Sequence, residues 1–351
     1  MPALRQSIVI AGGGTGGHLM PGLAVARALR AAGADDLVFV GTARGLEERL
    51  VPAAGFELRL ITIGGLKSGS LVRRAATLLQ LPRAVAQSVR ILRQRHVSVV
   101  FGIGGYASGP VLAAAALLRI PIVVLEVNAN TGLANRWAAR WVSAAAVNFP
   151  ETARDFRNAL FTGIPVRPEF FQARAPAEPP LVLIFGGSQG ARALNEAATA
   201  MAPQINFRIL HQTGTRDYEA VAAAYAPLGE RVRAMAFIEN MAGAMGEATL
   251  VVCRSGASTL GEIAAAQKPA ILVPYPAAAD QHQLRNAQAY ARAGAAVLLE
   301  QSQLTHASLA AAIASLLADA PYRAALQAAL APFAHPDAAE SIAQLVLRQR
   351  G

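Results

Sequence analysis

The stretch "AGGGTGGHLMPG", residues 11–22, decides the fold class of this chain. An apolar run at 7–11 leads into it, and an alanine-rich run at 23–29 with helical character follows it. Glycines between a strand and a helix expose backbone N–H groups, and the positive end of the helix dipole points at them. The stretch therefore predicts a strand, an anion-binding loop and a helix. His18 stands at the edge of the loop, and imidazole side chains are common general bases.

The same kind of junction recurs along the chain. The segments "GIGGYASGP" (102–110), "GGSQGAR" (186–192) and "CRSGASTLGE" (253–262) also follow apolar, β-branched runs. Helical patterns separate most of these runs, and this alternation is typical of α/β folds with parallel sheets covered on both faces. The expected strands are 7–11, 37–40, 58–62, 97–103, 122–127 and 145–149 in the first half, and 181–185, 207–211, 232–237, 250–253, 270–273 and 296–299 in the second.

The length of 351 residues favours two domains. The segment 163–180 contains five prolines and is the expected linker, since proline breaks helices and cannot donate to a sheet. Each half then begins with a strand and a glycine loop. We expect two doubly wound domains at 1–162 and 163–337, and a last helix at 338–350.

The composition is that of a globular protein, with 54% hydrophobic and 15% charged residues. A single cysteine, Cys253, excludes a disulfide framework. The uncharged run 96–118 is interrupted by glycines and a proline, so we expect a buried strand, a loop and a helix there and no transmembrane segment. The N-terminal residues do not predict a signal peptide.

The net charge of +10 is concentrated in the first half of the chain. Residues 1–162 hold 18 basic and 8 acidic residues, and no acidic residue occurs between Glu57 and Glu126. This excess of positive charge favours an anionic partner, such as a phosphorylated substrate or an anionic membrane surface. The alternative is an arginine-rich face that is simply exposed to solvent. A nucleic-acid-binding module is the least favoured interpretation, because residues 58–100 contain no Phe, Tyr or Trp.

The sequence lacks the complete motifs of several common cofactor and metal sites. Residues 12–17 contain G-x-G-x-x-G, but the next strand ends in Val40-Gly41-Thr42-Ala43, without the acid that usually binds the ribose of NAD. The chain carries no H-E-x-x-H, C-x-x-C or D-x-D pattern, so we expect no metal.

Glu262 has two interpretations. Ser258 or Thr259 could cap a helix, with Glu262 reaching back as in a capping box. Alternatively, the Glu262 carboxylate accepts hydrogen bonds from a ribose. The polar residues of 280–286 could then bind sugar hydroxyls.

The motifs named above, together with "GIPVR" (163–167) and "DQHQLRNA" (280–287), occur in the order and spacing of the MurG family, and the chain resembles this family over essentially its whole length. The resemblance implies a GT-B fold, with two Rossmann-like domains facing a central cleft and the last helix returning to the first domain. It implies an inverting hexosyltransferase of glycosyltransferase family 28 that moves GlcNAc from UDP-GlcNAc to the MurNAc 4-hydroxyl of undecaprenyl-pyrophosphoryl-MurNAc-pentapeptide. It further implies peptidoglycan synthesis at the cytoplasmic face of the bacterial inner membrane, with peripheral attachment, no cofactor and no nucleic acid.

The resemblance also implies site residues. The second domain would bind the donor and the first domain the acceptor. His18 would act as the general base, and Glu126 is the rival base. The substrate-binding residues would be Thr15, Gly16, Gly17, Asn128, Arg167, Ser188, Ile238, Ala257, Ser258, Thr259, Leu260, Gly261, Glu262, His282 and Gln283, with either His282 or Gln283 as the main GlcNAc contact.

The chain departs from the family pattern beside Glu126. Leu125 and Val127 stand where the family often has histidine and glutamine, so a role for those two side chains does not carry over. Other enzymes of this fold remain alternatives: a glycosyltransferase acting on another lipid acceptor, such as diacylglycerol, or a UDP-GlcNAc epimerase. A candidate membrane-docking surface lies in the acid-free stretch, where Lys67, Arg73, Arg74 and Arg83 accompany several leucines.

Overall fold

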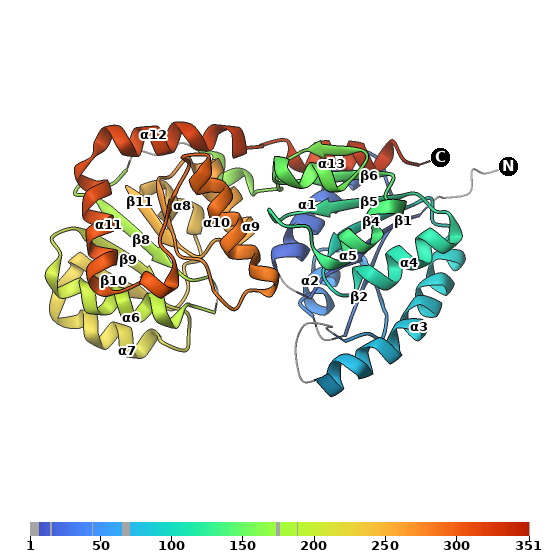
Figure 1. Ribbon diagram of the computed structural model, residues 1–351, viewed down its shortest axis with the longest axis horizontal. Coiled ribbons are helices and arrows are strands. Elements are labelled where there is room, and N and C mark those ends of the chain that lie inside the picture. The colour runs from blue at the N-terminus through green and yellow to red at the C-terminus, as the bar shows by residue number, and fades with distance from the viewer. Residues whose placement is uncertain are drawn as a thin grey trace. The chain divides into compact units, whose positions relative to one another are not determined.

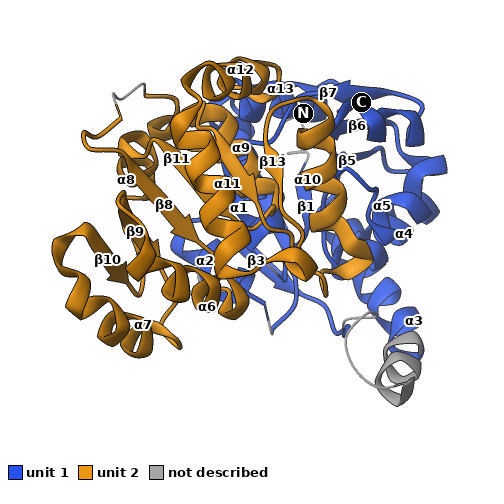
Figure 2. Cartoon of the chain, turned by 60° about the vertical axis from the view of Figure 1, so that its left-hand side comes forward, with its two compact units in different colours: residues 1–165, 337–351 blue, residues 166–336 orange. Residues whose placement is uncertain are grey.

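The computed structural model describes residues 7–14, 16–43, 45–64, 71–172, 176–187 and 189–350, with the side chains of 71–78 excluded. The chain forms two compact units (Figure 2). Unit 1 comprises Met1–Pro165 and Asp337–Gly351, and unit 2 comprises Val166–Pro336. Many of their helices and strands are labelled in Figure 1.

Unit 1 is built on a parallel sheet with the strand order β3-β2-β1-β4-β5-β6-β7. Every residue of β1, β2, β4 and β5 is buried, as expected for parallel strands covered on both faces. The strands are β1 (Ile8–Gly12), β2 (Leu37–Gly41), β3 (Glu57–Leu60), β4 (Val99–Gly104), β5 (Ile122–Glu126), β6 (Ala144–Val147) and β7 (Ala159–Phe161).

The helices of unit 1 connect these strands and include the C-terminal one. Helix α13 packs against α1, and α3 packs against α4. The helices are α1 (Gly16–Ala31), α2 (Glu47–Ala53), α3 (Leu71–Gln94), α4 (Ser108–Leu118), α5 (Leu133–Ala138) and α13 (Ala338–Leu347), with the 3₁₀ turns η1 (Ala139–Trp141) and η2 (Pro150–Asp155).

Unit 2 repeats the plan with the strand order β10-β9-β8-β11-β12-β13, all parallel. Its strands are β8 (Leu181–Phe185), β9 (Arg208–Gln212), β10 (Val232–Met235), β11 (Leu250–Cys253), β12 (Ala270–Leu272) and β13 (Val297–Leu298). Its helices are α6 (Arg192–Met201), α7 (Tyr218–Tyr225), α8 (Met241–Glu247), α9 (Ala257–Ala266), α10 (His282–Arg292), α11 (His306–Ala318) and α12 (Ala320–Leu330). The 3₁₀ turns are η3 (Pro168–Phe171), η4 (Ala202–Gln204), η5 (Ala226–Arg231), η6 (Ala279–Gln281), η7 (Gln301–Gln303) and η8 (Ala331–Phe333).

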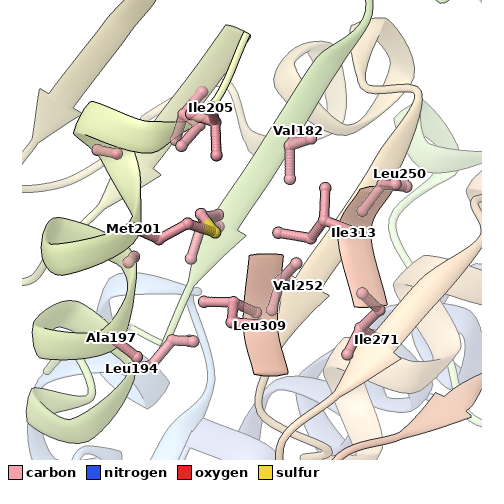
Figure 3. Close-up of a cluster of buried hydrophobic side chains, with 14 of the residues drawn as sticks. Val182, Leu194, Ala197, Met201, Ile205, Leu250, Val252, Ile271, Leu309 and Ile313 are labelled. Atoms are coloured by element: carbon pink, nitrogen blue, oxygen red, sulfur yellow. The ribbon is translucent and has the colours of Figure 1, made fainter. Parts of the chain in front are cut away.

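A continuous apolar core holds the sheet of unit 2 to its helices (Figure 3). Val182 and Val252 on the central strands meet Leu194 and Met201 of α6 and Leu309 of α11, and all five are fully buried. In unit 1 the corresponding cluster includes Val9, Val100 and Leu112. These cores fix the strand ends from which the loops emerge.

The structure confirms the predicted α/β class with two doubly wound sheets. All twelve predicted strands correspond to observed ones, but β7 was not predicted. The two units divide at Pro165/Val166, within the predicted linker 163–180, and the later part of this segment packs on unit 2, because Phe170 in η3 is fully buried and η3 packs on α8 and α9. The run 96–118 forms β4, a loop and α4. Among the described residues no single helix is long and apolar enough to span a membrane, although the bent pair 306–318 with 320–347 satisfies the same length and composition test.

Candidate functional site

The glycine loops lie at the topological switch point of each sheet. In unit 1 the chain order reverses between β1 and β4, which are followed by the loops at 12–17 and 104–107. In unit 2 it reverses between β8 and β11, which are followed by 186–191 and 254–256. In doubly wound sheets the ligand crevice lies outside the carboxyl ends of the strands at this point. Each unit therefore presents one candidate half-site, and the sequence-predicted residues divide between them.

The two loops of unit 1 touch through their backbones. The amide of Gly13 donates to the carbonyl oxygen of Gly104 at 3.3 Å. A Cβ atom on Gly12 would lie 2.2 Å from the same oxygen, and one on Gly105 would lie 2.2 Å from the oxygen of Gly13. All four residues also have positive φ. Only glycine permits this approach, so the packing of one loop on the other explains why both are glycine-rich.

His18 lies in the first turn of α1 and is half-buried. A Cβ on Gly104 would come within 2.7 Å of His18 Nδ1, so the imidazole rests on the backbone of the second loop. Gly16 and Gly17 open the same helix, and Thr15 is outside the described residues. Ser108, in the first turn of α4, is fully buried, and its hydroxyl has no hydrogen-bond partner among the described residues. Two helix N-termini and an imidazole thus converge on these loops.

Glu47 is a site residue that the sequence reasoning missed. It is fully buried beneath the first glycine loop. Its carboxylate accepts hydrogen bonds from the amide of Gly14 at 2.7 Å, and from the amide and hydroxyl of Thr42 at 3.0 Å each. A Cβ on Gly13 would lie 2.7 Å from the same carboxylate. Glu47 therefore fixes the loop conformation and has its acceptor positions occupied.

Glu126 ends β5 and is buried. Its Oε1 accepts from the amide of Asn128 at 3.1 Å, and its Oε2 accepts from the amide of Gly132 at 2.8 Å and Nδ2 of Asn135 at 3.0 Å. Burial raises the pKa of Glu126, while these donors oppose the rise. The geometry makes Glu126 a support for the loop that carries Asn128.

In unit 2, Gln212 is another residue that the sequence did not point to. Its buried side-chain amide connects the predicted glycine loop after β8 to Ile238. Its Nε2 donates to the carbonyl of Gly187 at 3.1 Å, and its Oε1 accepts from the amide of Ile238 at 2.8 Å. Gln212 therefore links the glycine loop after β8 to buried Ile238. Ser188, in that loop, lies outside the described residues.

Helix α9 begins directly after β11 with Gly256 at its N-cap, and no side chain caps it. The capping-box interpretation of Ser258, Thr259 and Glu262 is therefore wrong. The Ser258 hydroxyl is buried and has no partner among the described residues. Ala257, Leu260 and Gly261 are buried. The first-turn amides of α9 and the Ser258 hydroxyl are donors of the kind that can bind an anion at a helix N-terminus.

Glu262 is half-buried in the second turn of α9, and no described residue hydrogen-bonds its carboxylate. Burial raises the pKa of Glu262 to about 7, against the opposing charge of Arg167. Arg167 is exposed, and its guanidinium lies 4.9 Å from the centre of the Phe170 ring. A half-buried carboxylate without a hydrogen-bond donor among the described residues is suited to accept hydrogen bonds from a bound ligand.

The polar cluster after β12 adjoins α9 through Ser255, whose hydroxyl donates to the Gln283 carbonyl at 2.8 Å. The Gln283 side-chain oxygen accepts from the amide of Tyr275 at 2.9 Å. His282 Nδ1 lies 2.7 Å from the Ala279 carbonyl, so Nδ1 must carry the proton and Nε2 is the acceptor in the neutral ring. His282 can therefore accept a hydrogen bond at Nε2, and Gln283 can donate from its side-chain NH₂ group. Within the described ranges, no three His, Cys, Asp or Glu side chains are grouped to hold a metal ion.

Comparison with known proteins agrees with this division into two halves. Residues 8–147 match the glycosyltransferase family 28 N-terminal domain, and residues 181–342 match the family 28 C-terminal domain. A relative from Anaeromyxobacter dehalogenans (strain 2CP-C) is 46% identical, covering 97% of this chain and 92% of its own. One from Solibacter usitatus (strain Ellin6076) is 44% identical, covering 99% and 97%. Both are named UDP-N-acetylglucosamine–N-acetylmuramyl-(pentapeptide) pyrophosphoryl-undecaprenol N-acetylglucosamine transferase.

Solved structures give the same result. The crystal structure of MurG from Acinetobacter baumannii has a TM-score of 0.83 and 32% identity, covering 98% of this chain and 99% of that one. The calicheamicin glycosyltransferase CalG4 shares the fold with a TM-score of 0.72 at 18% identity, with 98% of each chain covered. The chain therefore belongs to the MurG family, within glycosyltransferase family 28.

Proposed function

We propose that this chain transfers GlcNAc from UDP-GlcNAc to the MurNAc 4-hydroxyl of undecaprenyl-pyrophosphoryl-MurNAc-pentapeptide, with inversion at the anomeric carbon. The names of the full-length relatives support the reaction. The observation that carries the proposal is the pair of half-sites, each with glycine loops and a helix N-terminus at a switch point. Both substrates contain a pyrophosphate, and such helix ends bind anionic groups.

In the donor half-site, we assign the UDP diphosphate to the N-terminus of α9 and the Ser258 hydroxyl, with Thr259 beside them. Glu262 would accept hydrogen bonds from the ribose. Ile238 would pack beside the uracil, and Arg167 and Ser188 would meet the nucleotide. The GlcNAc hydroxyls would bind Nε2 of His282 and the NH₂ group of Gln283.

In the acceptor half-site, Gly16, Gly17, Thr15 and Asn128 would line the sugar and pyrophosphate. The MurNAc O4 attacks the GlcNAc anomeric carbon while the bond from that carbon to the β-phosphate oxygen breaks. A ring nitrogen of His18 takes the O4 proton, and UDP leaves with its new charge stabilised by the α9 N-terminus and Arg167. We prefer His18 to Glu126 as the base because three N–H donors already occupy the Glu126 carboxylate.

The lipid-linked acceptor requires work at a bilayer, so we propose peripheral attachment at the cytoplasmic face of the inner membrane, with a role in peptidoglycan synthesis and so in cell shape and division. Of the predicted dock, Lys67 lies outside the described residues, and Arg73 and Arg74 belong to the start of α3, whose side chains at 71–78 are not described. Further along α3, Leu79 is 82% exposed and Arg83 is exposed. Cations beside apolar side chains favour an anionic lipid surface.

The test is transfer of labelled GlcNAc from UDP-GlcNAc to a soluble analogue of the lipid acceptor, with EDTA present. Diacylglycerol in detergent serves as the competing acceptor. We expect transfer to the muramyl analogue in EDTA and none to diacylglycerol. Transfer to diacylglycerol alone would identify another lipid glycosyltransferase. No turnover with either acceptor would refute the proposal.

A further inference from the structure

Strand β3 forms one edge of the unit 1 sheet, so one side of its backbone faces no other strand of that sheet. Ile61, directly after β3, shows which side this is, because its amide donates to the carbonyl of Gly41 in β2 at 2.9 Å. The N–H and C=O groups of successive residues in a parallel strand point alternately to its two sides. The backbone groups of Leu58 and Leu60 therefore point away from β2, toward the open edge.

Helix α3 covers the next outward position and leaves these two open. The amide of Thr62 also points away from β2, and it donates to Oε1 of Gln87 in α3 at 2.8 Å. Toward the start of β3, a groove of about 480 Å³ lies between strand residues 58–60 and the helix. Its helix wall repeats at the spacing of one helix face and consists of Gln87, Arg90, Ile91 and Gln94. The open edge thus borders a groove with a polar and partly apolar wall.

The groove carries positive charge. Arg59 and Arg90 line it, and none of its lining residues is acidic. Arg59 pairs with Glu57 at 2.6 Å, whereas Arg90 is exposed and has no ion pair within the part of the chain that the structure describes. Leu60 adds apolar surface, with 45% of its area exposed. An open strand edge gives affinity through main-chain hydrogen bonds, and the neighbouring side chains select the partner, here one with carboxylates.

Two other occupants fit this edge less well. A bilayer does not satisfy the open backbone groups, since unpaired sheet edges do not occur in the hydrocarbon region. A second copy of the chain, paired through its own β3, would place Arg59 and Arg90 of the two copies against each other. Like charges that face each other across strands or across an interface are destabilising.

We propose that β3 accepts an additional strand from an extended, acidic segment of a partner protein. The backbone of this segment pairs with Leu58 and Leu60, and its carboxylates meet Arg90. The four residues of β3 span about 13 Å, so the recognised segment is short. The edge is separate from the glycine loops, which follow the central strands β1 and β4, so the partner docks without occupying the acceptor half-site.

The test uses the full chain and a fluorescein-labelled peptide of alternating glutamate and valine. Fluorescence anisotropy measures its affinity. We expect binding that weakens with added salt, and binding at least tenfold weaker for a peptide of alternating lysine and valine. The glutamate–valine peptide with every backbone amide N-methylated keeps the charge and loses the donors, and it should not bind. Amide hydrogen exchange should slow at Leu58 and Leu60 when the unmethylated acidic peptide is added.

Variants separate the backbone contribution from the side-chain contribution. Leu60→Pro removes the outward N–H and no amide that faces β2, and it should weaken binding of the acidic peptide by about tenfold or more. The matched control Leu60→Ala keeps this N–H and should have a smaller effect. Arg90→Glu should also weaken binding by about tenfold, while Arg348→Glu, at an exposed arginine elsewhere, should leave it nearly unchanged. Melting temperature establishes that each variant is folded.

Several results would overturn the proposal. Equal binding of the acidic and lysine peptides, or no binding of the acidic peptide, would refute recognition of an acidic segment. Undiminished binding of the fully N-methylated peptide would refute strand addition even if Leu60→Pro failed to fold. Slower exchange at Leu58 and Leu60 that follows protein concentration without peptide would assign the edge to a second copy of the chain. GlcNAc transfer by the unmodified protein tests the proposed function separately, because peptide binding does not depend on it.

Discussion

Replacing Glu262 with glutamine should stabilise the free protein and weaken donor binding at the same time. Burial raises the pKa of Glu262 from 4.5 to about 7. Between these values the folded state binds more protons than the unfolded state, so the free energy of unfolding falls as pH rises from 4.5 to 7 and levels off above. A change of that size corresponds to roughly 3 kcal/mol. Because the carboxylate is partly solvated, we expect Glu262→Gln to recover about 1–2 kcal/mol at pH 8, a rise of a few degrees in Tm.

Donor binding should change in the opposite direction. A ribose hydroxyl donates best to an ionised carboxylate, so the affinity of the unmodified protein for UDP-GlcNAc should rise about tenfold between pH 6 and pH 8. Glu262→Gln should remove this pH dependence and weaken binding at pH 8 by roughly tenfold to a hundredfold. Glu262→Ala should also weaken binding without unfolding the protein.

Thermal unfolding from pH 5 to pH 9 and calorimetric titration with UDP-GlcNAc measure both effects. Glu219→Gln, at an exposed position in the first turn of α7, is the matched control and should alter neither. The reasoning fails if Glu262→Gln binds UDP-GlcNAc as tightly as the unmodified protein with the same pH dependence. A lower Tm at pH 8 would contradict the assigned pKa.

Three further substitutions test the supporting geometry. His18→Ala should lower kcat by about 10²–10⁴-fold with little change in UDP-GlcNAc affinity, while the control His306→Ala, at an exposed site in α11, should leave kcat unchanged. Near-normal turnover by His18→Ala would eliminate His18 as the base. Glu126→Gln should lower the melting temperature, because the new NH₂ group would face N–H donors that now meet a carboxylate oxygen. If Glu126→Gln instead had a normal Tm and no turnover, Glu126 would be the base. Gln212→Leu should raise KM for UDP-GlcNAc by about tenfold or more with a smaller change in kcat, and the KM of Gln212→Glu, which keeps the acceptor for Ile238, should lie between those of Gln212→Leu and the unmodified protein. An equal loss of kcat and kcat/KM at unchanged KM would argue against this positioning role.

The sequence was sufficient for most of the sheet architecture because parallel strands buried on both faces are continuous apolar runs. Strand β7 escaped because Ala159–Phe161 is three residues long and only half-buried at the sheet edge. A run that short carries no periodicity to distinguish it from a loop.

The supporting side chains were harder to predict than the loops. Glu47 lies six residues beyond the end of β2, at the start of a helix, and only the folded chain brings it under Gly14. Gln212 is the last residue of β9 and stands between His211 and Thr213, and this polar stretch gives no sign of its two partners. The capping-box alternative at 258–262 fails because Gly256 already provides the extended N-cap, which leaves the Ser258 hydroxyl without a partner among the described residues.

The backbone contact between the two glycine loops of unit 1 has a consequence for the recognition of the acceptor that we propose to bind there. Each loop blocks the other from relaxing, because carbonyl oxygens stand where any side chain would have to go. The conformational entropy of both loops is therefore lost once, when the chain folds, and is not lost again at each binding event. A recognition surface that is rigid before the substrate arrives discriminates by shape and cannot adapt to a different headgroup. A broader tolerance for acceptors would have to evolve through changes in the side chains around the two loops, while the glycines themselves are retained.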